Sequence, residues 1–133
     1  MSGSFLRPLL HDTQAKLVIR NSRNQRHLAH DLIAAFDSKT RRTGLLRHDS
    51  FPEGSAMLIA PTNAVHTFFM RFPIDIAFVT RDGRVVKTCN ALRPWRIAAS
   101  FGAYAVVELP AGTLSRCDTV AGDTIVIVPD GQV

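Results

Sequence analysis

Short apolar runs separated by polar residues, glycines and prolines make up most of this 133-residue sequence. Runs of this length between turn residues are typical of β-strands. They predict strands at residues 16–20, 56–60, 65–70, 74–80, 85–89, 103–109 and 124–128. Many short strands punctuated by Gly and Pro predict a mainly-β fold. We expect a single compact domain with barrel-like or jelly-roll-like packing and one short helix.

The segment at residues 27–36 (HLAHDLIAAF) fits two patterns. Four of its apolar residues have the spacing of one helix face, namely Leu28, Leu32, Ile33 and Phe36. A strand that pairs with residues 16–20 is the alternative, because short apolar runs fit both structures. The local pattern leaves the two alternatives open.

Two further local signals predict a turn and a helix. Asp82 and Gly83 lie between apolar runs and predict a two-residue type I′ hairpin, because both central residues of that turn take a positive φ. A short helix is expected over residues 40–46. Asp37 or Ser38 can cap it, since either side-chain oxygen accepts a hydrogen bond from an unpaired backbone N–H.

Composition adds limits on size and class. The chain is 46% hydrophobic and 20% charged, which excludes a disordered protein, and no apolar run is long enough to predict a membrane span. We expect one domain at residues 16–133 after a loose N-terminal segment at residues 1–15. Cys89 and Cys117 lack CxxC spacing, and the N-terminus lacks a secretory apolar core. Both features predict free thiols and a cytoplasmic location.

Positive charge is concentrated in the first third of the chain. Sixteen Lys and Arg residues exceed eleven Asp and Glu residues, which gives a formal net charge of +5. Up to Arg47 there are nine basic and three acidic residues, whereas the rest has seven basic and eight acidic residues. A basic patch can bind nucleic acid or an anionic surface, but a solvated positive face is the commoner explanation.

Two acidic residues lie inside predicted strands that are otherwise apolar. Asp75 is in IDIAFVT and Glu108 is in AVVEL. A buried carboxylate needs hydrogen bonds or a charged partner, or its pKa must rise. The two residues could form a general acid/base pair. Alternatively, they are structural acceptors for backbone N–H groups and for an arginine such as Arg71.

His66 and Trp95 are the other candidate site residues. A lone histidine in an apolar strand is more often a structural residue than a ligand. Trp95 lies between Arg93 and Arg96 in a proline-containing loop. There its indole can stack on an anionic or aromatic ligand, or it can plug the open end of a barrel. The sequence contains no recognised metal-ligand pattern, nucleophile motif or glycine-rich phosphate loop, so we expect no metal and no cofactor.

Four motifs follow one another in a specific order. They are R-x-G-L-L at residues 42–46, VHTFFMRFPID at 65–75, DGRV at 82–85, and ELPAG at 108–112 with a later Gly-Asp pair. This set resembles the domain-of-unknown-function family 192, which comprises small prokaryotic and archaeal proteins without an assigned activity. The resemblance covers residues 17–128. It implies a compact mainly-β fold in which residues 27–36 form a second strand. It implies no catalytic reaction. The family motif marks His66, Met70, Pro73, Asp75, Glu108, Pro110, Gly112 and Asp123.

These observations support one leading hypothesis and two alternatives. The leading hypothesis is a non-catalytic domain that binds a small polar ligand or has an accessory role. Its site would comprise His66, Arg71, Asp75 and Glu108, with Trp95 at the rim. The first alternative is a hydrolase or lyase that uses Asp75 or Glu108 as general base and His66 as acid. The second alternative is binding of an anionic surface or nucleic acid by the basic N-terminal third, with nucleic acid less expected.

Overall fold

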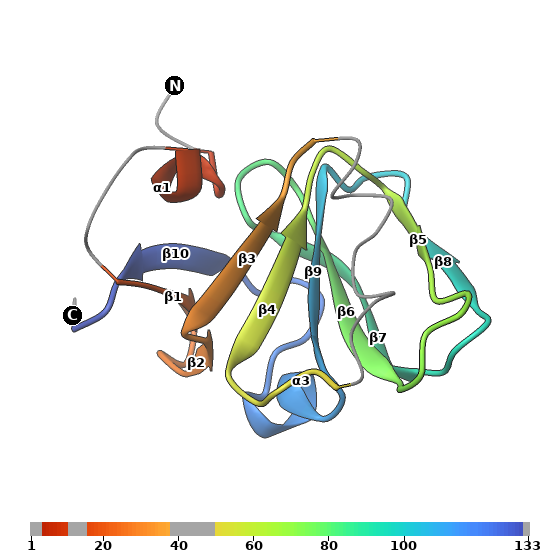
Figure 1. The fold of residues 1–133 in the computed structure, drawn as a ribbon. Helices are drawn as coiled ribbons and strands as arrows, with labels where there is room; N and C mark the ends of the chain where they lie inside the picture. Colours follow the sequence, from red (N-terminus) through yellow and green to blue (C-terminus); the bar gives the residue numbers. More distant parts are fainter. Residues whose placement is uncertain (1–3, 11–15, 38–49, 132–133) are drawn as a thin grey trace.

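The computed structural model describes residues 4–10, 16–37 and 50–131 and shows a mainly-β fold (Figure 1). Its strands are β1 (Leu17–Asn21), β2 (His27–Ala29), β3 (Asp31–Ala35), β4 (Ser55–Ile59), β5 (Ala64–His66), β6 (Ile74–Val79), β7 (Val85–Leu92), β8 (Ile97–Ala99), β9 (Ala105–Pro110) and β10 (Ile125–Pro129). The described chain also contains two single helical turns, α1 (Arg7–Leu10) and α3 (Thr113–Arg116).

The strands form three separate sheets. One sheet has the order β10-β1-β2, the second has the order β3-β4-β9-β6-β7, and β5 pairs with β8 in the third. The mainly-β prediction is confirmed. The predicted barrel-like or jelly-roll-like packing is not confirmed, because within the described chain each sheet has a linear strand order and none closes on itself. No helix among the described residues is long and apolar enough to cross a membrane.

The five-stranded sheet contains three adjacent strands that are buried on both faces. Every residue of β4, β9 and β6 is buried. Successive side chains of a strand point to opposite faces, so each strand contributes to two separate cores. On β6, for example, Ala77 and Val79 belong to one core and Ile76 and Phe78 to the other. Both faces of this sheet must therefore be covered.

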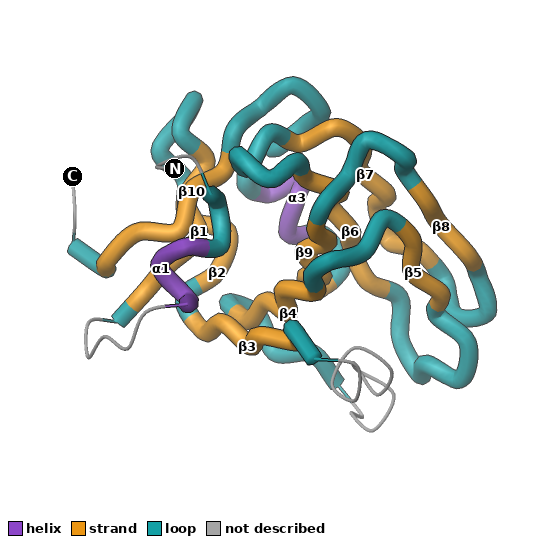
Figure 2. The backbone as a smooth tube through the Cα atoms, turned by 90° about the horizontal axis from the view of Figure 1, so that it is seen from above, coloured by secondary structure: helices purple, strands orange, loops and turns teal. Residues whose placement is uncertain are grey.

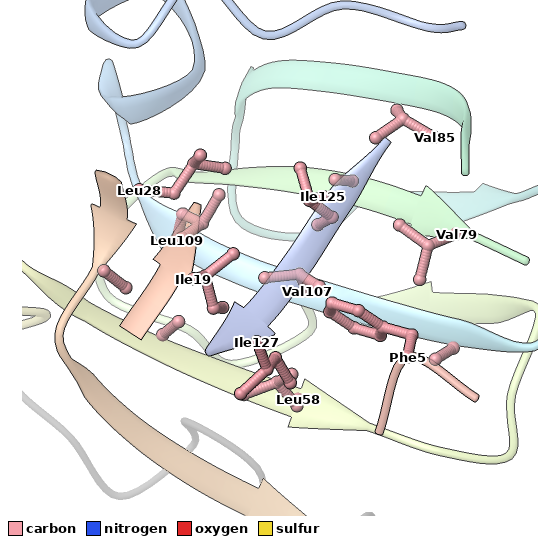
Figure 3. Packing of buried hydrophobic residues seen from close by; sticks show 14 of the residues in the cluster. Phe5, Ile19, Leu28, Leu58, Val79, Val85, Val107, Leu109, Ile125 and Ile127 are labelled. Atoms are coloured by element: carbon pink, nitrogen blue, oxygen red, sulfur yellow. The ribbon is translucent and has the colours of Figure 1, made fainter. Parts of the chain in front are cut away.

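The three-stranded sheet covers the first face. Ile19 of β1 and Ile125 of β10 pack against Val107 and Leu109 of β9 (Figure 3). Phe5, from the segment predicted to be loose, also packs in this core, and its backbone N–H donates to the carbonyl of Arg81 at 2.7 Å. The predicted division at residue 15 stays a prediction, but the described part of the N-terminal segment is tied to the domain.

The β5–β8 pair covers part of the second face. Val65 of β5 and Ala98 of β8 are register partners, and both belong to or pack on the core that contains Ile76 and Phe78. We call this pair of strands the arm. Figures 1 and 2 show the arm at one edge of the molecule, beyond β7. One of its faces is thus used for packing, and the opposite face points outward.

The local structure agrees with some of the sequence predictions and differs from others. Residues 27–36 are extended, as the resemblance implied, but they form two strands in different sheets, β2 beside β1 and β3 parallel to β4. The predicted strand at 65–70 is wrong from Thr67 onward, since β5 ends at His66. The predicted helix over 40–46 lies outside the described residues. Cys89 and Cys117 are free thiols, as predicted.

The Asp82-Gly83 hairpin exists, but its turn differs from the predicted type I′. Gly83 has a φ of 92°, whereas Asp82 does not have the positive φ that type I′ requires. The Gly83 N–H donates to the carbonyl of Thr80 at 3.0 Å, and the Thr80 N–H donates to the carbonyl of Arg84 at 2.9 Å. These bonds describe a three-residue loop that ends in a left-handed glycine. A Cβ at Gly83 would clash with the carbonyl oxygen of Ile125.

A buried polar network joins β1 to the loop before β10. The Asn21 amide donates to Thr119 Oγ1 and to Asp123 Oδ2, both at 3.0 Å. Arg23 Nε donates to Asp123 Oδ1 at 2.7 Å, and the same side chain also pairs with Asp118. The hydrogen bond from Arg23 is the main cause that holds the pKa of Asp123 well below its usual range. Part of the N-terminal positive charge is therefore used for folding.

We expect Asp123→Asn to unfold at a lower urea concentration than the wild type at pH 7. The folded pKa of Asp123 is lowered, so the carboxylate stabilises the fold above about pH 4, and this contribution is lost as the pH falls further. The difference between variant and wild type should therefore shrink towards pH 2. The exposed Asp82→Asn is the matched control. Equal urea midpoints for Asp123→Asn and wild type at pH 7 would contradict the role of the network.

Candidate functional site

Asp75 is a structural acceptor in this fold. Its Oδ1 accepts a hydrogen bond from the Ala91 N–H of β7 at 2.8 Å. Its Oδ2 accepts from the N–H groups of Gly112 at 3.1 Å and Leu114 at 2.9 Å, where α3 begins. Gly112 has no side chain to cap this helical turn, so the buried carboxylate takes that role. Asp75 thus ties β6 to β7 and to α3.

The two predicted carboxylates lie on opposite faces of the sheet. Asp75 is the register partner of Leu109, and Ile76 is the register partner of Glu108. Register partners on neighbouring strands share a face, and the next residue along each strand points the other way. Asp75 therefore shares the face of Leu109, and Glu108 shares the face of Ile76. This geometry contradicts a general acid/base pair of these two residues.

Glu108 lies in the centre of the second face. Met57 of β4 and Ile76 of β6 flank it, and the side chain is almost fully enclosed, with 4% of the residue exposed. Burial raises the pKa of Glu108 to about 7. No hydrogen bond or ion pair joins its carboxyl group to another residue in the described part of the chain. Near neutral pH this carboxyl group is a mixture of the protonated and the ionised form.

His66 and Arg71 lie outside the sheet. Val65 packs inward on the second core, so His66, the next residue of β5, points to the outward face of the arm. Arg71 follows the arm in an exposed loop. The polar site predicted around His66, Asp75 and Glu108 is therefore not assembled. Among the described residues, no group of three His, Cys, Asp or Glu side chains could hold a metal ion.

Four aromatic side chains meet where the arm ends. The Trp95 ring centroid lies 4.5 Å from that of Phe69 and 5.8 Å from that of Phe68, and Phe68 lies 4.8 Å from His66. We call these four residues the aromatic tip. Phe69 is 67% exposed and Trp95 is 55% exposed, so Trp95 does not plug the interior. Ile97, the register partner of His66, extends this apolar surface and is 69% exposed.

The buried residue Thr67 holds the tip together. Its hydroxyl donates to the Arg93 carbonyl at 2.6 Å and accepts from the Arg96 N–H at 2.9 Å. Its backbone N–H donates to the Arg96 carbonyl at 2.8 Å, and its own carbonyl accepts from the N–H of Trp95 at 2.9 Å and of Met70 at 3.2 Å. The side chain and the backbone of a single residue thus join the 67–70 turn to the 93–96 turn.

The backbone of the tip has an unusual conformation at two exposed rings, Phe69 and Trp95. Phe69 has a φ of 66° and Trp95 a φ of 67°. Bulky residues rarely adopt this left-handed conformation because the side chain clashes with the backbone, and such residues cluster at functional sites. The bonds to Thr67 outweigh this cost. Both rings are thus attached to turns that the hydrogen bonds of Thr67 hold together.

The tip carries positive charge. The chain segments 61–74 and 90–104 contain the three arginines Arg71, Arg93 and Arg96 and no Asp or Glu. All three arginines are exposed. In the basic N-terminal third, Arg23 binds Asp123 and Arg26 donates to the Arg116 carbonyl. The exposed combination of aromatic rings and arginines is thus located at the arm.

Sequence reasoning missed Thr67, Phe68 and Phe69 as site residues. Two features of the sequence could have indicated the tip. Two aromatic residues follow Thr67, and the single tryptophan lies between two arginines. Nothing in the local sequence joins these two segments, in which the bonded residues Thr67 and Arg93 are 26 residues apart. A depression of about 260 Å³, lined by Pro61, Thr62, Asn63, Ala103 and Tyr104, contains none of the predicted site residues.

The sequence matches the family model described as "Uncharacterized ACR, COG1430" (DUF192) over residues 19–127. The chain belongs to this family.

Two crystal structures resemble this chain. A Sinorhizobium meliloti 1021 protein, named provisionally as a transcription regulator, has a TM-score of 0.72 and 20% identity over 86% of this chain and 96% of its own. A Novosphingobium aromaticivorans DSM 12444 protein of unknown function has a TM-score of 0.69 and 20% identity over 83% of this chain and 82% of its own. No curated protein matches the DUF192 chain. These similarities show the fold and assign no activity.

We expect Asp75→Asn to lower the free energy of unfolding by about 2 kcal/mol, because an amide cannot accept all three backbone hydrogen bonds and faces at least one N–H with its own NH₂ group. Urea unfolding followed by circular dichroism measures the change. Asp31→Asn, an exposed position at the start of β3, is the matched control. A variant as stable as the control would rule out the capping role of Asp75.

Glu108→Gln, unlike Asp75→Asn, should raise the stability of the folded protein relative to wild type, and only at high pH. The folded pKa of about 7 exceeds the unfolded value of 4.5, so the wild type loses stability as the pH rises through this range. The amide that replaces the carboxyl group stays neutral. The stability of the variant relative to wild type should therefore rise by about 2–3 kcal/mol between pH 5 and pH 8. A difference that does not change with pH would show that the carboxyl group titrates normally.

Proposed function

We propose that this DUF192 protein is a non-catalytic binding domain whose recognition surface is the aromatic tip. The observation that carries the proposal is the pair Phe69 and Trp95. Both rings are more than half exposed, they contact each other, and both have a backbone conformation that bulky residues rarely adopt. Aromatic rings held in one position lose little conformational entropy on binding, so they make efficient contacts.

The chemistry of the tip favours a partner that is both anionic and partly apolar. Trp and Arg are enriched among residues that dominate binding energies, because they combine a large contact area with a charge or hydrogen-bond donors. Here Trp95 lies between Arg93 and Arg96, and no acidic residue is present in the two segments that build the tip. Negatively charged groups on a partner would meet no acidic residue from these two segments.

The polar site of the leading sequence hypothesis receives less support than the tip. Small-molecule sites are concave and bury most of their ligand, whereas the tip is an exposed surface. The hydrolase or lyase alternative needs Asp75, Glu108 and His66 in one pocket. The register, the three backbone hydrogen bonds of Asp75 and the outward position of His66 argue against that arrangement.

The single tryptophan of the chain reports directly on this surface. We expect the fluorescence emission of Trp95 to shift to shorter wavelength on titration with at least one of three anionic probes: poly(U) RNA, poly-glutamate, and vesicles of phosphatidylcholine and phosphatidylglycerol. Phe69→Ser keeps the reporter and should weaken that binding about tenfold or more. Circular dichroism verifies that the variant is folded.

Phe101→Ser is the matched control, because Phe101 is 94% exposed but lies in the turn after β8 and outside the tip. It should bind like the wild type. The proposal fails if none of the three probes changes the emission of Trp95. It also fails if Phe69→Ser and Phe101→Ser weaken binding equally.

A further inference from the structure

We infer that the partner of the aromatic tip is an anionic lipid surface and that Phe69, Trp95 and Ile97 insert into its interfacial layer. This inference rests on the proposed function and names the class of partner. The three side chains are each more than half exposed and lie together on the outward side of the arm. Aromatic and aliphatic side chains above a basic rim are the combination that binds the boundary between lipid headgroups and acyl chains.

The position of the arm allows insertion. β5 and β8 lie at one edge of the molecule, beyond β7, and α1, β1 and β10 lie at the opposite side (Figures 1 and 2). A lipid surface can approach this edge without contacting the three-stranded sheet. The inward face of the arm stays packed through Val65 and Ala98, so insertion of the outward face does not require unfolding.

The backbone of the tip is prepared for a medium with little water. An unpaired backbone N–H costs free energy when it leaves water, which is why inserted segments must satisfy their own hydrogen bonds. In the tip, internal bonds are donated by the N–H groups of Thr67, Phe68, Met70, Trp95 and Arg96. The Thr67 hydroxyl is also paired, with the Arg93 carbonyl. The two exposed rings can therefore enter the interface on turns whose polar groups are largely satisfied.

The charge of the tip selects an anionic surface. The side chains of Arg93 and Arg96 are exposed on either side of Trp95, and long basic side chains can reach lipid phosphates while the ring inserts. Each arginine near an anionic membrane strengthens binding about fivefold. Segments 61–74 and 90–104 contain no acidic residue that would oppose this attraction.

The size of the apolar surface favours lipid over a folded protein or RNA. The three exposed side chains offer on the order of 400 Å², whereas a stable protein interface buries about 800 Å² on each partner. Single-stranded RNA stacks its bases on aromatic platforms, but the Trp95 and Phe69 rings are inclined at 60° to each other. A fluid lipid surface requires neither a large matching area nor parallel rings.

The inference is tested by sedimentation with vesicles and by the emission of Trp95 in the same samples. We expect the wild type to bind phosphatidylcholine vesicles that contain half phosphatidylglycerol, with a shift of the emission to shorter wavelength and protection from acrylamide quenching. Pure phosphatidylcholine vesicles should bind much more weakly. Phe69→Ser and Ile97→Ser should each reduce binding about tenfold. The double variant Arg93→Gln, Arg96→Gln should reduce it about twentyfold, and Phe101→Ser should leave it unchanged.

Two results would overturn the inference. In the first, poly(U) or poly-glutamate shifts the Trp95 emission but anionic vesicles do not. The binding function of the tip would then stand, and its partner would be RNA or an acidic protein segment. In the second, vesicles bind but Trp95 stays accessible to acrylamide, which would exclude insertion even if a serine variant failed to fold. If no anionic probe changes the emission, both the inference and the proposed function fail.

Discussion

The burial of β4, β9 and β6 on both faces is the constraint on which the rest of the structure depends. Three adjacent strands of this kind need a cover on each side, and the chain supplies two different covers. The β10-β1-β2 sheet and Phe5 cover one face, and the β5–β8 arm packs on the other. Because side chains alternate, the same constraint puts Asp75 and Glu108 in separate surroundings.

The two buried carboxyl groups illustrate two solutions to the cost of burial. Asp75 accepts three backbone hydrogen bonds and in return fixes the start of α3. Glu108 has apolar neighbours, and its pKa rises instead. Neither role requires a ligand. The features that point outward to a partner are found on the arm, whose inward face is needed for packing and whose outward face is free to carry other chemistry.

Much of the fold could be predicted from the sequence, and the arrangement of the site could not. The strand at 74–80 was evident because both sets of alternating residues are largely apolar, and the need of the Asp75 carboxylate for hydrogen-bond donors followed from its place in that strand. Whether Asp75 and Glu108 face each other depends on the register of β6 against β9. A shift of one residue would have brought them to the same face. The register between two segments some thirty residues apart cannot be inferred from either segment alone.

The end of β5 shows the same limit. Alternation alone extends the strand from Val65 to Met70, but Thr67 uses its hydroxyl and its peptide group to hold the 93–96 turn. This tertiary contact stops the strand and turns Phe69 outward. His66 and Trp95 were singled out from the sequence, whereas Thr67, Phe68 and Phe69 become candidate site residues only once the two turns meet.

The central claim is that this DUF192 protein binds through its arm and not through the face that contains Glu108. The most direct measurement is a map of backbone amide NMR shifts during titration with nanodiscs that contain phosphatidylglycerol. The account predicts shift changes concentrated at residues 65–71 and 93–97, with Met57, Ile76 and Glu108 unaffected. Changes centred on those three sheet residues, with the two turns unchanged, would contradict it.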